Sequence, residues 1–191
     1  MQVATVQHDS AKREMTRTCA RQIAWVVGFA VALVLSAQVR FYAPGSAVPV
    51  TLQTAVVLLA GFWLRPKLAA GAVALYLAAG FTLAGAAPGL AVFAAFAAGK
   101  AATLGYLIGF LPAAALVSAL VGQFARLTFG RALAIGLVGM TVMFACGLAW
   151  LTVLTGSAVV AVQQGLAPFV VWALVKTGVV AALASAAPLR R

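Results

Sequence analysis

A single lysine interrupts the last apolar stretch of the chain. Lys176 is the one charged residue of the run 167–184, and the two carboxylate side chains of the protein, Asp9 and Glu14, lie near the N-terminus. A charge inside a membrane costs about 2.5 to 3.5 kcal/mol on insertion scales and usually marks a pathway or a binding site. We therefore expect the anionic partner of Lys176 to be a ligand. The alternatives are that desolvation makes this lysine neutral, or that carbonyl groups at a broken helix hold it.

The elements that must position this lysine are membrane-spanning helices. Of the 191 residues, 65% are hydrophobic and 8% are charged, and the mean hydropathy is +1.11. The apolar runs are rich in Ala, Leu, Gly and Val and are long enough for helices, and they lack the alternation of a membrane barrel strand. The sequence predicts an all-α integral membrane protein, a bundle of six transmembrane helices at about 22–39, 50–64, 68–84, 104–122, 132–155 and 164–187.

Positive charge sets the expected topology. Lys and Arg in short loops concentrate on the cytoplasmic side of a membrane. With six spans and both termini cytoplasmic, ten basic residues fall on that side: Lys12, Arg13, Arg17, Arg21, Arg65, Lys67, Arg126, Arg131, Arg190 and Arg191. A seventh span at 86–99 would move the later basic clusters to the outer side of the membrane. We therefore interpret this apolar segment as re-entrant or lid-like, within the connection 86–103. Residues 1–20 are expected to form a cytoplasmic tail and 21–189 a single transmembrane domain of a multi-pass cell-membrane protein.

Two more basic residues depart from this distribution. Arg40 follows the first span and Lys100 precedes the fourth, both on the outer side, while Lys176 lies roughly 12 residues into the sixth span, near mid-membrane at about 1.5 Å per residue. Together the three predict a basic path inward from the outer face. The alternative for Arg40 and Lys100 is ordinary snorkelling to the membrane interface.

The residue inventory excludes several classes of function. The only histidine, His8, and both acids lie near the N-terminus, so no catalytic triad or carboxylate pair can form within the membrane. Cys19 and Cys146 are isolated, so the cysteines do not form a set of metal ligands. We expect no enzyme activity, no metal and no cofactor. The net charge of +11 is explained by orientation and anionic lipid headgroups, and nucleic acid is not expected as a partner.

Energy must come from elsewhere if transport is active. The sequence around Gly99 and Lys100 does not match a nucleotide-binding loop. The lack of carboxylates within the spans also removes the usual residues for proton or sodium coupling. The protein therefore either facilitates transport or depends on a partner.

The first outer loop, 38–54, carries the most specific local sequence. Pro44 and Gly45 mark a turn, and Thr51, Gln53 and Thr54 bring polar side chains to the start of the second span. Such groups face a cavity or another helix. The alternative is that they cap the helix and bond between helices.

Several motifs together resemble the BioY family, the biotin-binding S component of energy-coupling-factor (ECF) transporters. The motifs are Val48-Pro-Val-Thr-Leu-Gln-Thr54, Leu58-Leu-Ala-Gly61, Arg65-Pro-Lys67, Leu75-Tyr-Leu77 and Gly105-Tyr-Leu-Ile-Gly-Phe110, with Pro168-Phe169 and Lys176 at the expected spacing further on. The resemblance implies a six-helix bundle of the ECF S-component type that captures biotin from outside. In many such systems it works with a transmembrane coupling protein and two cytoplasmic ATPases.

Two positions depart from the family pattern. The family usually carries Pro-Gly-Asp where this chain has Val171-Trp172-Ala173, so an acidic group expected near the ligand is missing. The family's Gly-Pro-Thr-Gly-Gly-Tyr is replaced by Ala101-Ala-Thr-Leu-Gly-Tyr106, with Lys100 directly ahead.

A binding site for biotin follows from the chemistry of its parts. Lys176 is expected to pair with the carboxylate, with Lys100 or Arg40 as the alternative if the ligand enters in the opposite sense. Trp172 shares a helix face with Lys176 and is expected to pack on the thiophane ring.

Other residues are assigned to the ureido group. Gln53, Thr51 and Tyr106 are its expected partners, and Gly105 would permit close backbone approach. The alternative for Trp172 and Tyr106 is a place in the interfacial aromatic belt.

Small residues predict helix contacts on two spans. Ala24, Gly28 and Ala32 recur every four residues, and in the BioY family such a face docks the coupling protein. The alternative is packing within the bundle or self-association. A second close-packed face is expected at Gly136, Gly139 and Gly147.

The sequence as a whole predicts a substrate-binding membrane subunit for vitamin uptake, with biotin as the substrate. Partner ATPases are expected to energise it through a coupling protein. The alternatives are a structural or assembly membrane protein that binds no ligand, and an uncoupled facilitator of the same fold.

Overall fold

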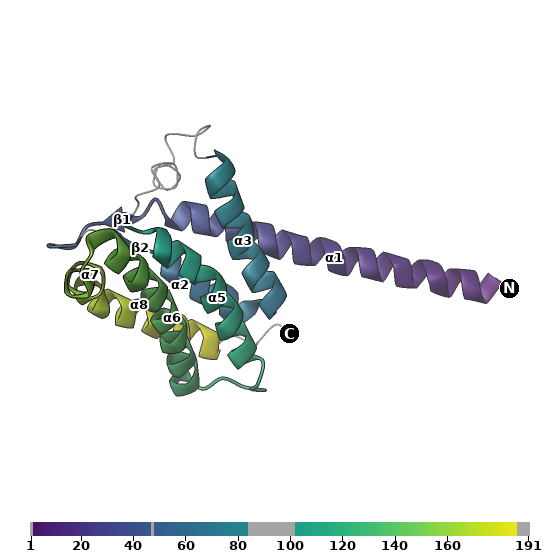
Figure 1. Ribbon diagram of the computed structural model, residues 1–191. Helices are drawn as coiled ribbons and strands as arrows, with labels where there is room; N and C mark the ends of the chain where they lie inside the picture. The colour runs from purple at the N-terminus through teal and green to yellow at the C-terminus, as the bar shows by residue number, and fades with distance from the viewer. Residues whose placement is uncertain (1, 47, 84–101, 187–191) are drawn as a thin grey trace.

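The computed structural model describes residues 2–46, 48–83 and 102–186. Its elements run in the order α1 (Gln2–Ser36), β1 (Arg40–Phe41), β2 (Val50–Thr51), α2 (Gln53–Trp63), α3 (Pro66–Leu83), α5 (Leu104–Val121), α6 (Phe129–Thr155), α7 (Ala158–Gly165), the short 3₁₀ helix η1 (Ala167–Phe169) and α8 (Val170–Ala186). The helices form a bundle, and the two short strands form an antiparallel pair at one end (Figure 1).

Local sequence explains where several helices begin and end. Thr128 and Ser157 precede α6 and α7, and their hydroxyls accept hydrogen bonds from the backbone N–H groups of Arg131 and Val160. Gly156 ends α6 in the left-handed conformation, with φ of 70°. Pro66 begins α3, and a proline disfavours helical backbone in the residue before it, so α2 stops at Trp63.

The predicted spans correspond to the observed helices, with three differences. Within the described residues, four stretches are long and apolar enough to cross a membrane: Glu14–Ser36, Leu104–Val121, Phe129–Thr155 and Ala158–Ala186. The helices α2 and α3 are shorter apolar helices. Helix α1 continues back to Gln2, so the expected tail is helical, and α7 and η1 precede α8 where one continuous sixth span was expected. The predicted re-entrant segment lies outside the described residues, apart from positions 102 and 103.

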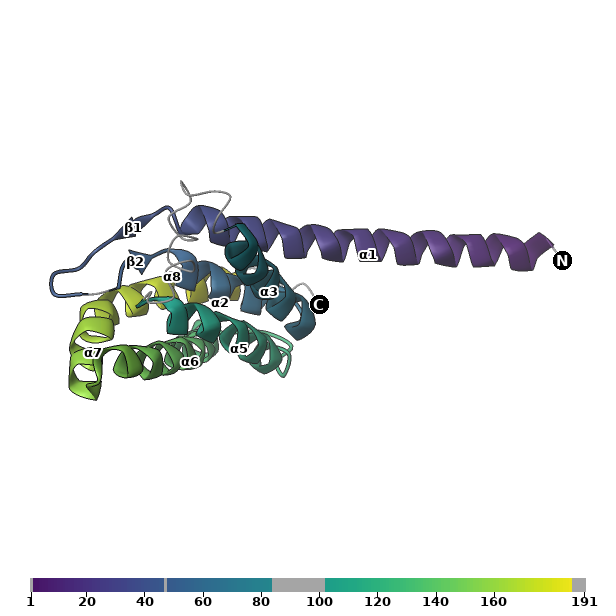
Figure 2. The same cartoon turned by 45° about the horizontal axis from the view of Figure 1, so that its top comes forward.

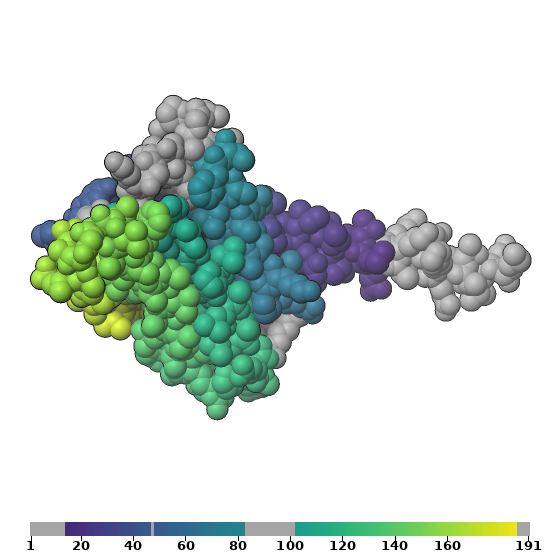
Figure 3. Space-filling model, in the orientation of Figure 1, coloured from purple at the N-terminus to yellow at the C-terminus, as the bar shows by residue number. Residues whose placement is uncertain are grey.

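The two ends of the bundle differ in character. We call the end that carries β1, β2 and α7 the hairpin end, and the end with the α2–α3 and α5–α6 connections the loop end (Figures 1 and 2). The N-terminal part of α1 projects beyond the loop end, and the space-filling view shows it leaving the body of the molecule (Figure 3). Exposed basic residues gather at the loop end: Arg65, Lys67, Arg126 and Arg131.

Glycines bring α6 close to its neighbours. A Cβ added at Gly139 would lie 2.5 Å from Val117 of α5 and 2.8 Å from Leu58 of α2. At Gly136 it would lie 2.6 Å from Thr177 of α8, and at Gly147 it would overlap the ring of Tyr106. The predicted close-packed face of this span is therefore confirmed.

The outer surface of the bundle is apolar. On α1 the side chains of Ile23, Val27, Val31 and Leu35 recur every four residues and are exposed, and α8 exposes a similar set. A soluble protein rarely shows such continuous apolar surface, whereas the lipid of a membrane covers it at no cost.

Candidate ligand-binding site

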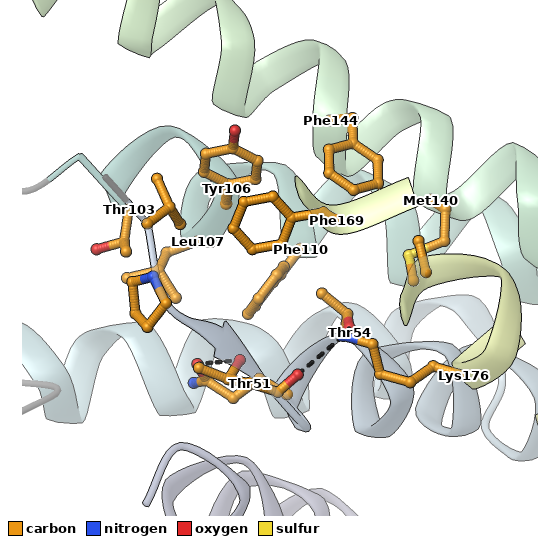
Figure 4. Close-up of a pocket in the computed structure, with 14 residues that line it drawn as sticks. Thr51, Thr54, Thr103, Tyr106, Leu107, Phe110, Met140, Phe144, Phe169 and Lys176 are labelled. Atoms are coloured by element: carbon orange, nitrogen blue, oxygen red, sulfur yellow. Dashed lines mark hydrogen bonds between the residues drawn. The ribbon is translucent and has the colours of Figure 1, made fainter. Parts of the chain in front are cut away.

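A cavity lies between the β2–α2 segment, the first turns of α5, the middle of α6, η1 and α8. Its lining is mostly apolar, with a small polar part that includes one charged side chain among the described residues. The lining consists of Val48, Pro49, Thr51, Gln53, Thr54, Thr103, Tyr106, Leu107, Phe110, Met140, Phe144, Phe169, Ala173 and Lys176 (Figure 4).

Lys176 reaches this cavity from α8, which packs beside α2. Its Nζ donates a hydrogen bond of 3.0 Å to the carbonyl oxygen of Thr51 and one of 2.9 Å to the Oγ1 of Thr54. Both partners are neutral, so neither compensates the charge of the ammonium group. An ammonium group has three N–H donors, which leaves one for a ligand. The predicted alternative is that carbonyl groups at a broken helix hold this lysine. The structure agrees with part of it, because the carbonyl group of Thr51 at the β2–α2 junction accepts a hydrogen bond from Nζ. The helix α8, which carries Lys176, is unbroken.

The residues Thr51, Gln53 and Thr54 form what we call the polar corner. The Oγ1 of Thr51 donates to the Oε1 of Gln53 at 3.3 Å, and the Nε2 of Gln53 donates to the hydroxyl of Tyr76 at 2.7 Å. Gln53 is only 5% exposed, so these bonds compensate the burial of its amide. The polar corner is thereby fixed at both ends, to Lys176 of α8 and to Tyr76 of α3.

Four aromatic residues, Tyr106, Phe110, Phe144 and Phe169, form what we call the aromatic wall. The ring centroids of Tyr106 and Phe144 lie 6.1 Å apart at 87°, and those of Phe144 and Phe169 lie 6.4 Å apart at 61°. These are edge-to-face contacts, which aromatic pairs favour. Figure 4 shows Tyr106 and Phe144 across the cavity from Thr51. The wall can pack against an apolar ring of a ligand.

Tyr106 contributes its ring to the cavity, while its hydroxyl is engaged elsewhere. The hydroxyl donates to the carbonyl oxygen of Gly165 at 2.8 Å. Figure 4 shows it pointing away from the polar corner. The bond ties α5 to the end of α7. The structure therefore favours a packing role for Tyr106 over the predicted bond to a ureido group.

Trp172 lies outside the cavity lining. It is 44% exposed, and its ring contacts that of Phe41 in β1 edge-on, with centroids 5.1 Å apart. A step of four residues turns an α-helix by about 400°, so residue 172 is displaced by about 40° from the direction of residue 176. Ala173, displaced to the other side, takes the place on the cavity wall. The shared helix face predicted for Trp172 and Lys176 does not bring both to one cavity.

Of the three remaining predicted site residues, two lie outside the cavity lining and one lies outside the described residues. Gly105 lies against α6, where an added Cβ would come within 2.6 Å of the carbonyl oxygen of Cys146, so its close approach is to a helix and not to the cavity. Arg40 is exposed in β1, opposite Thr51 in the strand pair, and does not line the cavity. Lys100 lies outside the described residues.

Several lining residues are not predicted from the sequence. Thr54 is expected only as a polar residue at the start of the second span, and it lines the cavity. Met140 and Phe144 are four residues apart in α6, a spacing that places them on one helix face. An apolar residue in an apolar helix carries no signal of its own that distinguishes a cavity wall from the core.

Comparisons with known proteins assign the family. Family profiles match the BioY family over residues 7–190. The chain belongs to the BioY family. Among solved structures, the bundle matches the S-component for biotin from an ECF-type ABC transporter, a crystal structure at 2.1 Å. The TM-score is 0.71 at 19% identity, over 89% of this chain and 92% of that chain, which establishes the S-component fold. A search of curated proteins found no match.

The small-residue face of α1 is open in this bundle. Ala24 and Gly28 are exposed and Ala32 is partly exposed. No described atom outside α1 lies within 4 Å of a Cβ added at Gly28. Of the alternatives for this face, packing within the bundle does not account for Gly28.

Proposed function

We propose that this BioY-family protein is the substrate-binding membrane subunit of a biotin uptake system, and not an enzyme. The observation that carries the proposal is the cavity in which one lysine ammonium, with neutral partners, faces an aromatic wall. Biotin combines a carboxylate with an apolar ring, so it complements both features. The S-component fold and the family membership support the same assignment.

The geometry favours one orientation of the ligand. Lys176 and the polar corner are in direct contact, so they form one end of the site and receive one of the two polar ends of biotin. We assign the carboxylate to this end, because Lys176 is the one charged residue of the described lining and hydrogen bonds between ions are the strong ones. The thiophane ring then packs on the aromatic wall.

The ureido head lies at the far side of the cavity in this orientation. Gln53 and Thr51, its predicted partners, are then at the carboxylate end, next to Lys176. Figure 4 shows Thr103 on the side opposite Lys176. Thr103 precedes α5, and its side chain makes no capping hydrogen bond to that helix. We assign Thr103, a lining residue at this side, to the ureido group.

Partners supply the energy for uptake in this proposal. A transmembrane coupling protein docks on the face formed by Ala24, Gly28 and Ala32, and ATPase subunits bind that protein on the cytoplasmic side. The openness of this face supports the assignment, because small residues permit close contact between helices. The protein resides in the cytoplasmic membrane with both termini in the cytoplasm, an orientation supported by the exposed basic residues at the loop end.

Equilibrium dialysis with radiolabelled biotin tests the proposed substrate. The protein is purified in detergent, and excess unlabelled biotin, thiamine or riboflavin is added in parallel. Saturable binding that only biotin displaces is expected. A folded protein that shows no saturable biotin binding contradicts the proposal and favours a structural role.

A further inference from the structure

Tyr76 is a buried polar residue close to the cavity but outside its lining. It lies in α3, is 0% exposed, and is among the largest fully buried side chains of the described core. Its hydroxyl accepts a 2.7 Å hydrogen bond from the Nε2 of Gln53. A tyrosine hydroxyl in an apolar core requires a partner, and the partner here is a cavity residue.

The bond between Tyr76 and Gln53 is the first link of a continuous chain. Gln53 accepts from the Oγ1 of Thr51 at 3.3 Å, and the carbonyl oxygen of Thr51 accepts from the Nζ of Lys176 at 3.0 Å. Three segments far apart in the sequence, in α3, at the β2–α2 junction and in α8, are thereby joined. Lys176, which lines the cavity, is at one end of the chain and Tyr76 is at the other.

The start of α2 depends on this chain for its position. Leu52 occupies the N-cap position and supplies no side-chain hydrogen bond, so the usual capping interaction is missing. Gln53 is the first residue of α2 and is held by Tyr76 instead. The ring of Tyr76 is enclosed on all sides, so its hydroxyl is a fixed point for the amide of Gln53.

We propose that Tyr76 is a positioning residue for substrate binding, which acts through Gln53 and Thr51 to hold the Lys176 ammonium where a ligand carboxylate meets it. The inference rests on the proposed function, because it concerns the affinity of the same site. Tyr76 itself does not touch the substrate.

The test compares two variants that each remove one buried hydroxyl. Tyr76→Phe removes the bond to Gln53 and keeps the ring. Ser118→Ala is the matched control, because the Oγ of Ser118, 4% exposed, donates at 2.5 Å to the carbonyl oxygen of Leu64 and does not line the cavity. Biotin affinity is measured by calorimetry for both variants, for Gln53→Met, and for the double variant of Tyr76→Phe with Gln53→Met.

The expected result distinguishes positioning from general stability. Tyr76→Phe weakens biotin binding about tenfold, since it leaves a buried amide unpaired at the site, while Ser118→Ala changes affinity less than about twofold. In the Gln53→Met background Tyr76→Phe causes no further loss, because the link is already broken. The proposal is overturned if Tyr76→Phe binds biotin as tightly as the wild type. It is also overturned if the losses of affinity caused by Tyr76→Phe and Gln53→Met add fully in the double variant. If Tyr76→Phe does not fold, Gln53→Met alone must show the loss, and wild-type affinity there overturns the proposal.

A second readout needs no ligand, so it separates this inference from the proposed function. Hydrogen–deuterium exchange of the segment 51–57 is measured without biotin. Faster exchange in Tyr76→Phe, with unchanged exchange in Ser118→Ala, supports the positioning role even if the wild type fails to bind biotin. Unchanged exchange in Tyr76→Phe overturns it.

Discussion

Lys176 holds its ammonium group against neutral oxygen atoms, and this arrangement favours an anionic ligand. The two hydrogen bonds to Thr51 and Thr54 orient the group without cancelling its charge. A carboxylate that enters the cavity finds a donor that is already in place, so little conformational freedom is lost on binding. With Ala173 on the same wall, no acidic side chain of the described lining competes for the lysine.

The two aromatic residues nearest in sequence to this lysine are predicted to differ in their effect on affinity. Phe169 is 7% exposed and belongs to the aromatic wall, whereas Trp172 contacts Phe41 on the outside. We expect Phe169→Ala to weaken biotin binding about tenfold or more, because a ring that packs on the ligand is lost. Trp172→Ala should change the affinity less than about threefold. Calorimetry of both variants measures this difference. A larger loss for Trp172→Ala would indicate that its ring contacts the ligand, which contradicts this prediction.

At the scale of elements, α6 is held close to α5 by its glycines. Gly147→Ala is expected to destabilise the protein by about 1–3 kcal/mol, because the added Cβ overlaps the ring of Tyr106. The midpoint of thermal unfolding in detergent should fall accordingly, and biotin affinity should fall with it, since Tyr106 belongs to the aromatic wall.

Gly178→Ala in α8 is the matched control for this prediction. No described atom outside its own helix lies within 4 Å of a Cβ added there. Alanine is favoured over glycine inside a helix by about 1 kcal/mol, so the unfolding midpoint should stay or rise slightly. Equal destabilisation by both substitutions would contradict the close packing of α6.

A substitution on the open face of α1 is predicted to separate ligand binding from coupling to the proposed partner. Gly28→Leu adds a side chain where this chain has free space, so biotin affinity of the isolated protein should stay within about twofold of the wild type. The larger side chain blocks close helix contact, so ATP-dependent biotin uptake in cells that supply the coupling protein and ATPases should be lost. Uptake that persists in this variant would move the partner interface elsewhere.

At the scale of the whole molecule, charge distribution predicts the orientation in the membrane. Tyr42 is 63% exposed at the hairpin end, and Gln123 is exposed in the α5–α6 connection at the loop end. In a background that lacks Cys19 and Cys146, a membrane-impermeant thiol reagent added to intact cells should label Tyr42→Cys. It should label Gln123→Cys only after lysis. The reverse pattern would invert the topology and place the cavity on the cytoplasmic side.

The sequence predicted the bundle well because composition and positive charge act over whole helices. The helices predicted from the apolar runs differ from the observed helices mainly at their ends. Helix α1 extends back to Gln2, and α7 is a separate helix before α8. The sequence predicts four lining residues, Lys176, Gln53, Thr51 and Tyr106, because each is a polar group in an apolar setting or lies beside one in a motif. All four line the cavity.

Other parts of the site were beyond a sequence argument. Which way Trp172 faces depends on a rotation of about 40° around α8, which spacing alone does not resolve. The hydrogen bond between Gln53 and Tyr76 joins residues that are 23 apart in the sequence and lie on different helices. Neither local motif indicates that the two residues are in contact. The hydroxyl of Tyr106 is directed to Gly165 by packing between α5 and α7, which the sequence gives no means to foresee.

The measurement that tests the central claim most directly is calorimetry of the wild type and Lys176→Met with biotin and with its neutral amide. We expect the wild type to bind biotin at least about tenfold more tightly than the amide, since a hydrogen bond to a charged group contributes about 1.5–3 kcal/mol. Lys176→Met should bind both ligands weakly and equally. Biotin binding that is unchanged in Lys176→Met, or an amide that binds the wild type as tightly as biotin does, would contradict the account.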